Sequence, residues 1–420
     1  MSENTTNACG QIIAQNTEHD VLFTRVGSNY SKICTQPDLP LDLKSLWETK
    51  VNPIGNYRNM SIDNIEECLV ELNLAFSGRN TVIQDTTSDS ASTLYAIQER
   101  GVRNLSLLRC CHPHDDISKD NEFIESSVKK MRAELLVGTA CSSEAVTKQQ
   151  PKSNAVSCDL GLPCMPPKLE LTHHEELMLQ TCGELHKQLG NDSSKQFIGG
   201  ITTLPLIIVN CPPFSSVYAD VLNILLASGA DLTRVLFTQV ALNSDSIKLW
   251  SSLLRYHPCS ICVDTWGYCS VFAPLFLSTP FPNDTVLMDG VLQLCAEGRC
   301  KQLVLSLAIY CKIQLRAYGG YGYGYLHSTI VPALRDRLRG VAHDQPHSYS
   351  SSELESALVR GNAQALLYWR PALVQHQAAI QTLPCHICGK QFVPGNHFSK
   401  FQFDYCSSAC LATHRRADWK

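Results

Sequence analysis

The sequence has no long apolar run and no strong excess of charge of either sign. No stretch approaches the roughly 18 apolar residues of a membrane-spanning helix. The first residues, MSENTTNACGQ, are polar and lack the apolar core of a secretion signal. The 39 acidic and 35 basic side chains give a net charge of −4. These absences argue against a membrane protein, a secreted protein and a nucleic-acid-binding protein with a basic face.

Cysteine, in contrast, is abundant, with 20 residues in a chain of 420. Many of these cysteines lie inside apolar runs, where a buried free thiol is the usual state. Without a secretion signal, the pattern predicts a reducing compartment, the cytoplasm or the nucleus. The sequence contains no Gly-x-Ser-x-Gly elbow, and no single cysteine stands out as a nucleophile.

Short apolar or β-branched runs alternate with helical patterns over most of the chain. This alternation predicts βα units around a parallel sheet, in the α/β class. Eight such runs make a (β/α)8 TIM-type barrel the expected fold. The expected strands are residues 20–26, 104–110, 133–139, 155–163, 204–211, 234–240, 260–267 and 302–310.

The spacing of these runs is uneven, which predicts a barrel that is partly eroded on one side. A polar insertion falls near residues 40–100, and residues 140–154 form a poor helix. We expect a barrel domain at residues 1–375, a linker at 376–384 and a small zinc-binding module at 385–420.

The C-terminal module carries the strongest local motif. A C-x2-C pair is followed, after 17 residues, by a C-x3-C pair. Four thiolates suit the tetrahedral coordination of zinc, and so short a segment needs a metal to fold. The motif and its YCSSAC ending resemble the MYM or FCS type of zinc finger and predict a treble clef with one structural zinc. The expected ligands are Cys385, Cys388, Cys406 and Cys410, with His397 and His414 in reserve.

An ordered series of motifs runs through the second half of the chain. Residues 315–335 read LRAYGGYGYGYLHSTIVPALR, then come Leu338-Arg339-Gly340 and, at 361–367, GNAQALL. Together with residues 171–210 and 222–267, this series resembles the phosphotriesterase-related family of the amidohydrolase superfamily. The resemblance implies a binuclear metal hydrolase. Its histidines and carboxylates would lie at the C-terminal ends of the barrel strands.

The resemblance also places the family's metal ligands on this chain, and most fall on unsuitable residues. The matched positions, in strand order, are Arg25, Asp159, Asn210, Gln239 and Ala308. The first-strand pair falls on Phe23 and Arg25, or on Glu18 and Asp20 in a shifted alignment. No matched position holds an imidazole, so a binuclear site cannot be built from this set.

Three functions follow, of which we favour the first. The first is a pseudoenzyme scaffold with protein partners, in which loop 319–325 (GGYGYGY) offers aromatic rings to a small molecule or a peptide. The second is a metal-dependent hydrolase of ester, lactone or amide bonds with relocated ligands. It requires Asp159 to meet His112 and His114, or residues 18–20. The third is a nucleic-acid-associated zinc-finger protein.

Overall fold

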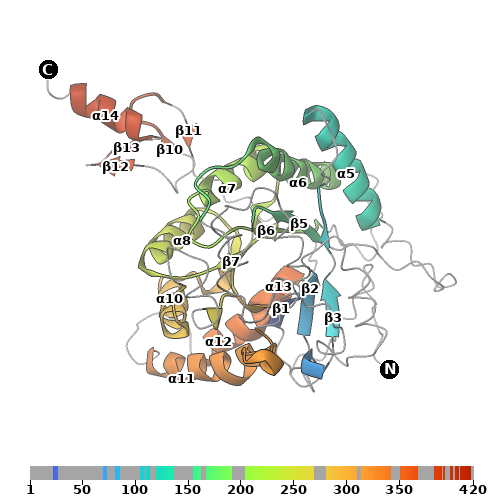
Figure 1. Cartoon of the computed structure of the whole chain (residues 1–420). Helices are drawn as coiled ribbons and strands as arrows, with labels where there is room; N and C mark the ends of the chain where they lie inside the picture. Colours follow the sequence, from blue (N-terminus) through green and yellow to red (C-terminus); the bar gives the residue numbers. More distant parts are fainter. Residues whose placement is uncertain are drawn as a thin grey trace, which may run out of the picture.

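In the computed structural model, parallel strands form an inner ring that helices surround, and the C-terminal elements lie to one side (Figure 1). The structure describes residues 22–26, 70–72, 81–85, 105–108, 110–113, 120–136, 155–161, 167–191, 204–268, 281–309, 314–341, 351–367, 383–389, 391–392, 398–400, 403–405 and 407–417. Among these residues, no helix is long and apolar enough to cross a membrane.

One sheet contains nine strand segments in the order β3-β2-β1-β9-β8-β7-β6-β5-β4, all paired in parallel. β3 and β4 lie one position apart in the chain, so they are two parts of one barrel strand. The sheet therefore closes as the expected eight-stranded barrel. Its segments are β1 (Leu22–Val26), β2 (Thr81–Asp85), β3 (Leu105–Leu108), β4 (Cys110–Cys111), β5 (Ala155–Asp159), β6 (Leu206–Asn210), β7 (Val235–Val240), β8 (Ser260–Val263) and β9 (Leu303–Ile309).

Two features of the predicted strand pattern were wrong. We expected a strand at residues 133–139, but residues 133–136 are the end of helix α5 (Asp120–Leu136). That helix buries Phe123, Val128 and Met131. A short apolar run does not by itself distinguish a strand from the end of a buried helix. The missing strand is β2, which lies inside the expected polar insertion and pairs with β1 and β3. The predicted erosion of the barrel came from these two errors.

The helices follow the expected pattern more closely. Side-chain caps mark three of their starts, with Thr172 and Glu175 before α6, Asn243 and Ser246 at α8, and Asn283 at α10. The helices are α6 (His173–Asn191), α7 (Tyr218–Ala227), α8 (Ser244–Tyr256), α10 (Asp284–Ala296), α11 (Val331–Val341), α12 (Ser351–Ser356) and α13 (Asn362–Leu367). Short 3-10 turns are η2 (Leu232–Arg234), η3 (Cys300–Gln302) and η5 (Arg316–Tyr318), and π-helical turns are η6 (Leu326–Ile330) and η7 (Ala357–Gly361).

The barrel interior changes from apolar to polar along the strands. Alternate strand residues share a face, and near the strand starts this face carries Leu206, Leu236 and Val304, which cluster with Ala363 and Leu366 of α13. Further along the same strands, the positions in step with these residues are polar and include Ser157, Asp159, Asn210 and Thr238. The polar end is the C-terminal end of the barrel, where active sites of this fold lie.

His186 on α6 joins the segments that precede two barrel strands. Its Nδ1 accepts a hydrogen bond from the Asp231 backbone N–H at 3.2 Å, and its Nε2 lies 2.9 Å from the Pro205 carbonyl oxygen. This pattern requires a neutral ring that carries its proton on Nε2. Burial lowers the pKa of His186 to about 4, because charging the ring would cost its solvation.

We therefore expect His186 to make the barrel less stable as the pH falls from about 6.5 to about 4. In this window the unfolded chain takes up a proton at His186 and the folded chain does not. The free energy of unfolding therefore decreases as the pH decreases. The total loss is about 3 kcal/mol, and it ends below the folded pKa. Urea unfolding at several pH values should reveal this slope and show it reduced in His186→Gln, which retains an N–H donor. Equal slopes in both proteins would contradict the assignment.

Candidate functional site

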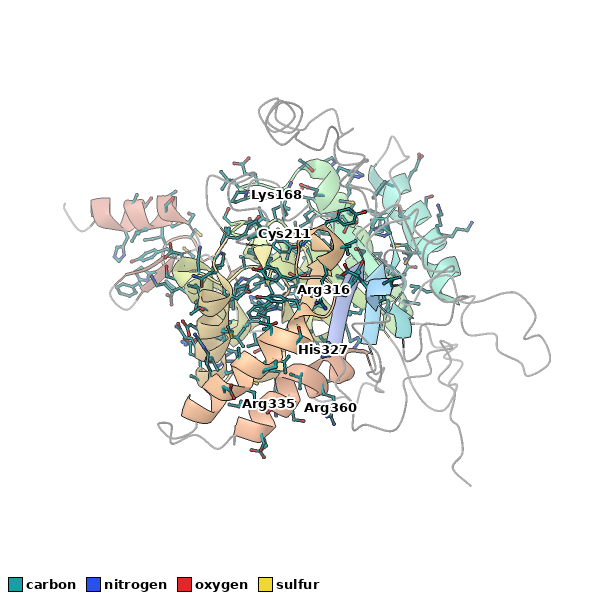
Figure 2. The ribbon with its side chains drawn as sticks, turned by 60° about the horizontal axis from the view of Figure 1, so that its bottom comes forward. Lys168, Cys211, Arg316, His327, Arg335 and Arg360 are labelled. Atoms are coloured by element: carbon teal, nitrogen blue, oxygen red, sulfur yellow. The ribbon has the colours of Figure 1, made fainter. Side chains whose placement is uncertain are left out.

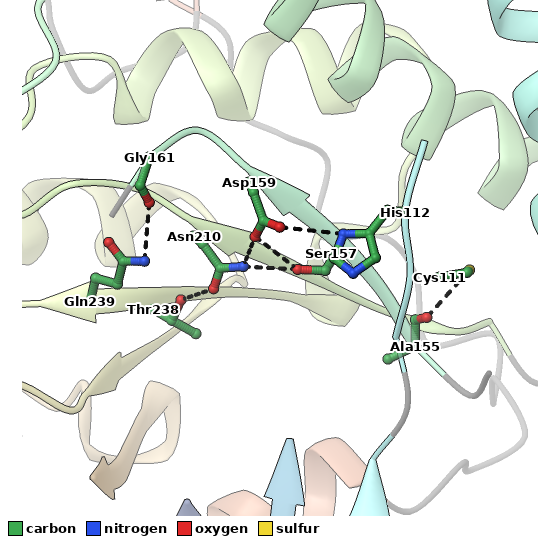
Figure 3. A network of polar contacts seen from close by, with 9 residues as sticks. All are labelled: Cys111, His112, Ala155, Ser157, Asp159, Gly161, Asn210, Thr238 and Gln239. Carbon is green, nitrogen blue, oxygen red and sulfur yellow. Dashed lines mark hydrogen bonds and ion pairs between the residues drawn. The ribbon is translucent and has the colours of Figure 1, made fainter. Parts of the chain in front are cut away.

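The polar network at the barrel mouth centres on Asp159 and Asn210, the last residues of two neighbouring strands (Figure 3). The Asn210 Nδ2 donates to Asp159 Oδ1 and, at 2.8 Å, to the Ser157 hydroxyl. Ser157 in turn donates to Asp159 Oδ1 at 3.1 Å, and Thr238 donates to Asn210 Oδ1 at 2.5 Å. One carboxylate oxygen of Asp159 is therefore occupied by two protein donors.

The second oxygen of Asp159 faces His112, which follows β4 directly. The distance from His112 Nδ1 to Asp159 Oδ2 is 3.3 Å, and the side chains are 19% and 44% exposed. The hydrolase hypothesis requires Asp159 to meet His112 and His114, and the structure brings Asp159 and His112 together. His114 and residues 18–20, the other groups named for that role, lie outside the described residues.

Gln239, at the sixth-strand position, holds a neighbouring loop. Its backbone φ of 63° is unusual for a residue with a side chain. The pairing of β7 with β8 shifts register between Phe237 and Val240, in the segment that contains Gln239. A left-handed conformation costs about 1–3 kcal/mol in such a residue. The buried side chain donates from Nε2 to the Gly161 carbonyl oxygen at 3.1 Å, in the segment after β5.

Ala308, at the eighth-strand position, contributes only backbone groups to the mouth. Its N–H donates to the Asp264 carbonyl oxygen at 3.1 Å, and its own carbonyl accepts from Tyr268 and Gln314 at 2.9 and 3.0 Å. The β1–β9 register sets Arg25 beside Ala308. Asp264, which follows β8, is fully buried. We did not predict Asp264, Ser157 or Thr238, although the two-residue period of the strands indicated their inward positions.

These residues do not fit a binuclear metal centre. An amide N–H offers no lone pair to a cation, and the Asn210 amide points its N–H groups at the carboxylate. Among the described residues, the one group of three or more possible metal ligands lies in the C-terminal module, not at the mouth. The contacts seen at the mouth are hydrogen bonds and one histidine–carboxylate pair.

Two thiols near the mouth are protonated and unsuited to nucleophilic attack. Burial raises the pKa of Cys211, the residue after Asn210, to about 12. A hydrogen bond with Cys182 and then burial raise the pKa of Cys158 on β5. Because the thiolate is the reactive form, neither residue is a candidate nucleophile.

The C-terminal module brings three of the four expected zinc ligands together. The sulfur atoms of Cys385, Cys388 and Cys410 lie within 4.8 Å of one another. Cys406 and His397 lie outside the described residues. Two small hairpins and one helix carry the cluster, and they are β10 (Leu383–Pro384), β11 (Gln391–Phe392), β12 (Phe398–Lys400), β13 (Phe403–Tyr405) and α14 (Ser408–Ala417).

His414, expected as a reserve ligand, is used differently. Its Nδ1 forms a hydrogen bond with the Tyr405 hydroxyl. Its ring packs 4.9 Å from the ring of His386, which stacks on Phe403 at 3.9 Å. His414 therefore lies in the small aromatic core of the module, and the cysteine cluster does not include it.

Comparison with known families agrees with both parts of this picture. Residues 167–350 match the phosphotriesterase family, and residues 380–420 match the Vms1-associating treble clef domain. The barrel is phosphotriesterase-like. The predicted treble clef is confirmed, and the model that matches it is that of the Vms1-associating treble clef domain.

Named relatives share this phosphotriesterase-like barrel over most of its length. A phosphotriesterase-related protein of Nematostella vectensis is 22% identical over 353 residues, which are 80% of this chain and 91% of the relative. An N-acetyltaurine hydrolase of Bos taurus is 21% identical over 310 residues, 72% of this chain and 80% of the relative. The likeness to these relatives extends beyond residues 167–350, the segment that the family model matches.

Solved structures show the same fold. A phosphotriesterase homology protein from Escherichia coli, complexed with phosphate in its active site, has a TM-score of 0.55 and 16% identity. It covers 83% of this chain and 99% of its own. A resiniferatoxin-binding protein from Rhodobacter sphaeroides has a TM-score of 0.57 and 16% identity, with 83% and 90% covered. At this identity, the likeness concerns the barrel and not its chemistry.

Proposed function

We propose that this protein is a pseudoenzyme, in which a phosphotriesterase-like barrel without its binuclear metal ligands acts as a protein-interaction scaffold. The contact that carries the proposal is the hydrogen bond from the Asn210 amide to Asp159. A cation bound through both oxygens of Asp159 would have to displace the two donors on its Oδ1, and Asn210 and Ala308 supply neither imidazole nor carboxylate in return.

The treble clef fits a structural role in the same scaffold. Cys385, Cys388 and Cys410 suit zinc by their chemistry and spacing, and Cys406 would supply the fourth thiolate. When bound, zinc cross-links the hairpins to α14. The name of the matched domain, Vms1-associating, supports a role in contacts with protein.

The second candidate is a hydrolase, and the pair formed by His112 and Asp159 favours it. The name of the bovine relative makes N-acetyltaurine one substrate to include. A histidine held by a carboxylate can act as a general base when a substrate places its reacting atom nearby. The pair therefore needs a direct test.

We expect no turnover by the purified full chain. The test is hydrolysis of N-acetyltaurine, a nitrophenyl ester, a lactone and a phosphotriester, with zinc or manganese added. Rates should equal those of the chain with Asp159→Ala, because the described residues of the mouth form no group of three or more ligands that could hold a hydroxide-generating cation. Hydrolysis that depends on the metal and is lost in both Asp159→Ala and His112→Ala would overturn the pseudoenzyme and establish the second candidate.

A further inference from the structure

Exposed apolar side chains gather around the loop that follows β9, at the same end of the barrel as the polar network. They are Val70, Tyr318 and Tyr321, which are 59%, 47% and 39% exposed. Glu71, the neighbour of Val70, accepts a hydrogen bond from the Ala317 backbone N–H at 3.2 Å. This bond places Val70 beside the loop. Exposed apolar side chains on neighbouring segments mark interaction sites.

Arg316 adds a positive charge to this surface (Figure 2). The aliphatic part of the Arg316 side chain packs directly against Gly322. A Cβ atom added at Gly322 would lie only 2.5 Å from Arg316 Cγ and 2.5 Å from Glu71 Oε2, so a larger residue would not fit there. Gly322, with a φ of 70°, thus permits the stem to pack closely. The residue is exposed, and its guanidinium forms no ion pair with the acidic groups that the structure describes. It is therefore available to a carboxylate from outside the chain.

A small hollow beside Tyr321 completes the surface. Trp266, Leu307, Ile309 and Gln314 line it, together with two glycines and Tyr321 itself. The lining is apolar apart from one amide, and the hollow has about the size of one water molecule, so it fits a single methyl group. It lies at the ends of β8 and β9, next to the exposed rings.

The loop around the hollow is held in place before any partner arrives. Tyr321 stacks on Tyr325 with ring centres 4.0 Å apart, and Tyr325 donates to Asp284 at 2.6 Å. The Gly267 N–H donates to the same carboxylate at 2.7 Å. A rigid surface loses little entropy on binding, which raises affinity.

We propose that Val70, Arg316, Tyr318 and Tyr321, here called the mouth surface, dock an acidic linear segment of a partner protein. One methyl group of an aliphatic side chain of the segment enters the hollow, and a carboxylate of the segment pairs with the guanidinium of Arg316. Tyrosine and arginine are the residues that most often dominate binding energy at protein interfaces. The inference rests on the proposed scaffold function and gives it a site and a class of partner.

The test is selection of random dodecapeptides displayed on phage against the full chain, followed by titration of the enriched peptides. We expect these peptides to combine acidic residues with an aliphatic one. Arg316→Glu and Tyr321→Ala should each weaken their binding at least about tenfold. Leu169→Ala is the matched control, since Leu169 is 75% exposed outside the mouth surface, and it should leave binding unchanged.

Three outcomes would overturn the docking proposal: no enrichment over the Arg316→Glu chain, enrichment of basic peptides, or binding that Arg316→Glu leaves intact. If Arg316→Glu lowers the unfolding midpoint, Arg316→Gln replaces it. Hydrolysis is measured on the same preparations. Turnover with intact peptide binding overturns the pseudoenzyme alone, whereas lost docking without turnover overturns the mouth surface alone.

Discussion

Replacing Cys385 with serine is expected to remove zinc from the protein and unfold the C-terminal module while the barrel stays folded. Cys385 is 2% exposed, and its sulfur lies within 4.8 Å of those of Cys388 and Cys410. The hairpins of this module have strands of two or three residues, too little to form a core. Zinc contributes about 10–16 kcal/mol of apparent folding free energy in such modules.

Elemental analysis tests this expectation. We expect about one zinc per intact chain and almost none in Cys385→Ser or in a chain ending at Gln375. Cys110→Ser, a change of a half-buried cysteine in the barrel, is the control and should retain the metal. Zinc retained in full by Cys385→Ser would contradict the zinc assignment. Two or more metal ions retained by the chain ending at Gln375 would contradict the proposed loss of the barrel's metal centre.

Trp250→Ala is expected to destabilise the barrel by about 4 kcal/mol, because it empties a large volume in the layer between strands and helices. Trp250 on α8 is 1% exposed. Its ring centre lies 4.5 Å from that of Tyr218 on α7 and 5.4 Å from that of Phe237 on β7. Aromatic pairs add about 0.5–1.5 kcal/mol to the effect of burial.

Urea unfolding followed by far-UV circular dichroism gives the size of this loss. Trp250→Phe retains a ring and should lose less than half as much free energy. Val286→Ala, at a partly exposed position on α10, should change it by no more than about 0.5 kcal/mol. A loss below about 2 kcal/mol in Trp250→Ala would mean that this aromatic cluster does not anchor α7 and α8 to the sheet.

Much of the fold could be predicted because some segments have one compatible structure. β6, β7 and β9 are buried along their whole length, and their continuous apolar sequences are those of strands covered on both faces. Residues 133–136 were misassigned because the sequence AELL is compatible with a strand and with the end of a helix. Only the burial of one face of α5 shows that these residues are helical. β2 was missed because its five residues, TVIQD, end in polar groups.

The candidate site divides in the same way. Motif spacing along the chain was enough to predict Cys385, Cys388 and Cys410 as neighbours. The resemblance to the phosphotriesterase-related family placed Asp159, Asn210, Gln239 and Ala308 in the last two positions of their strands. The meeting of His112 with Asp159 was named as a requirement of the hydrolase hypothesis, but no local pattern could establish it. The two residues are 47 positions apart, and the pairing of β4 with β5 brings them together. The role of His414 was equally invisible, because it depends on packing against His386 and Tyr405.

Order along the chain therefore determined the barrel class and the treble clef, since both depend on residue identity and spacing. It also predicts that Asn210, Gln239 and Ala308 replace metal-binding residues of the family. Tertiary structure alone decided which groups meet. The occupied carboxylate of Asp159, the left-handed turn at Gln239 and the mouth surface around Arg316 all join segments that are remote in sequence. Closure of the sheet brings the strand ends into contact, and that closure depends on the whole chain packing at once.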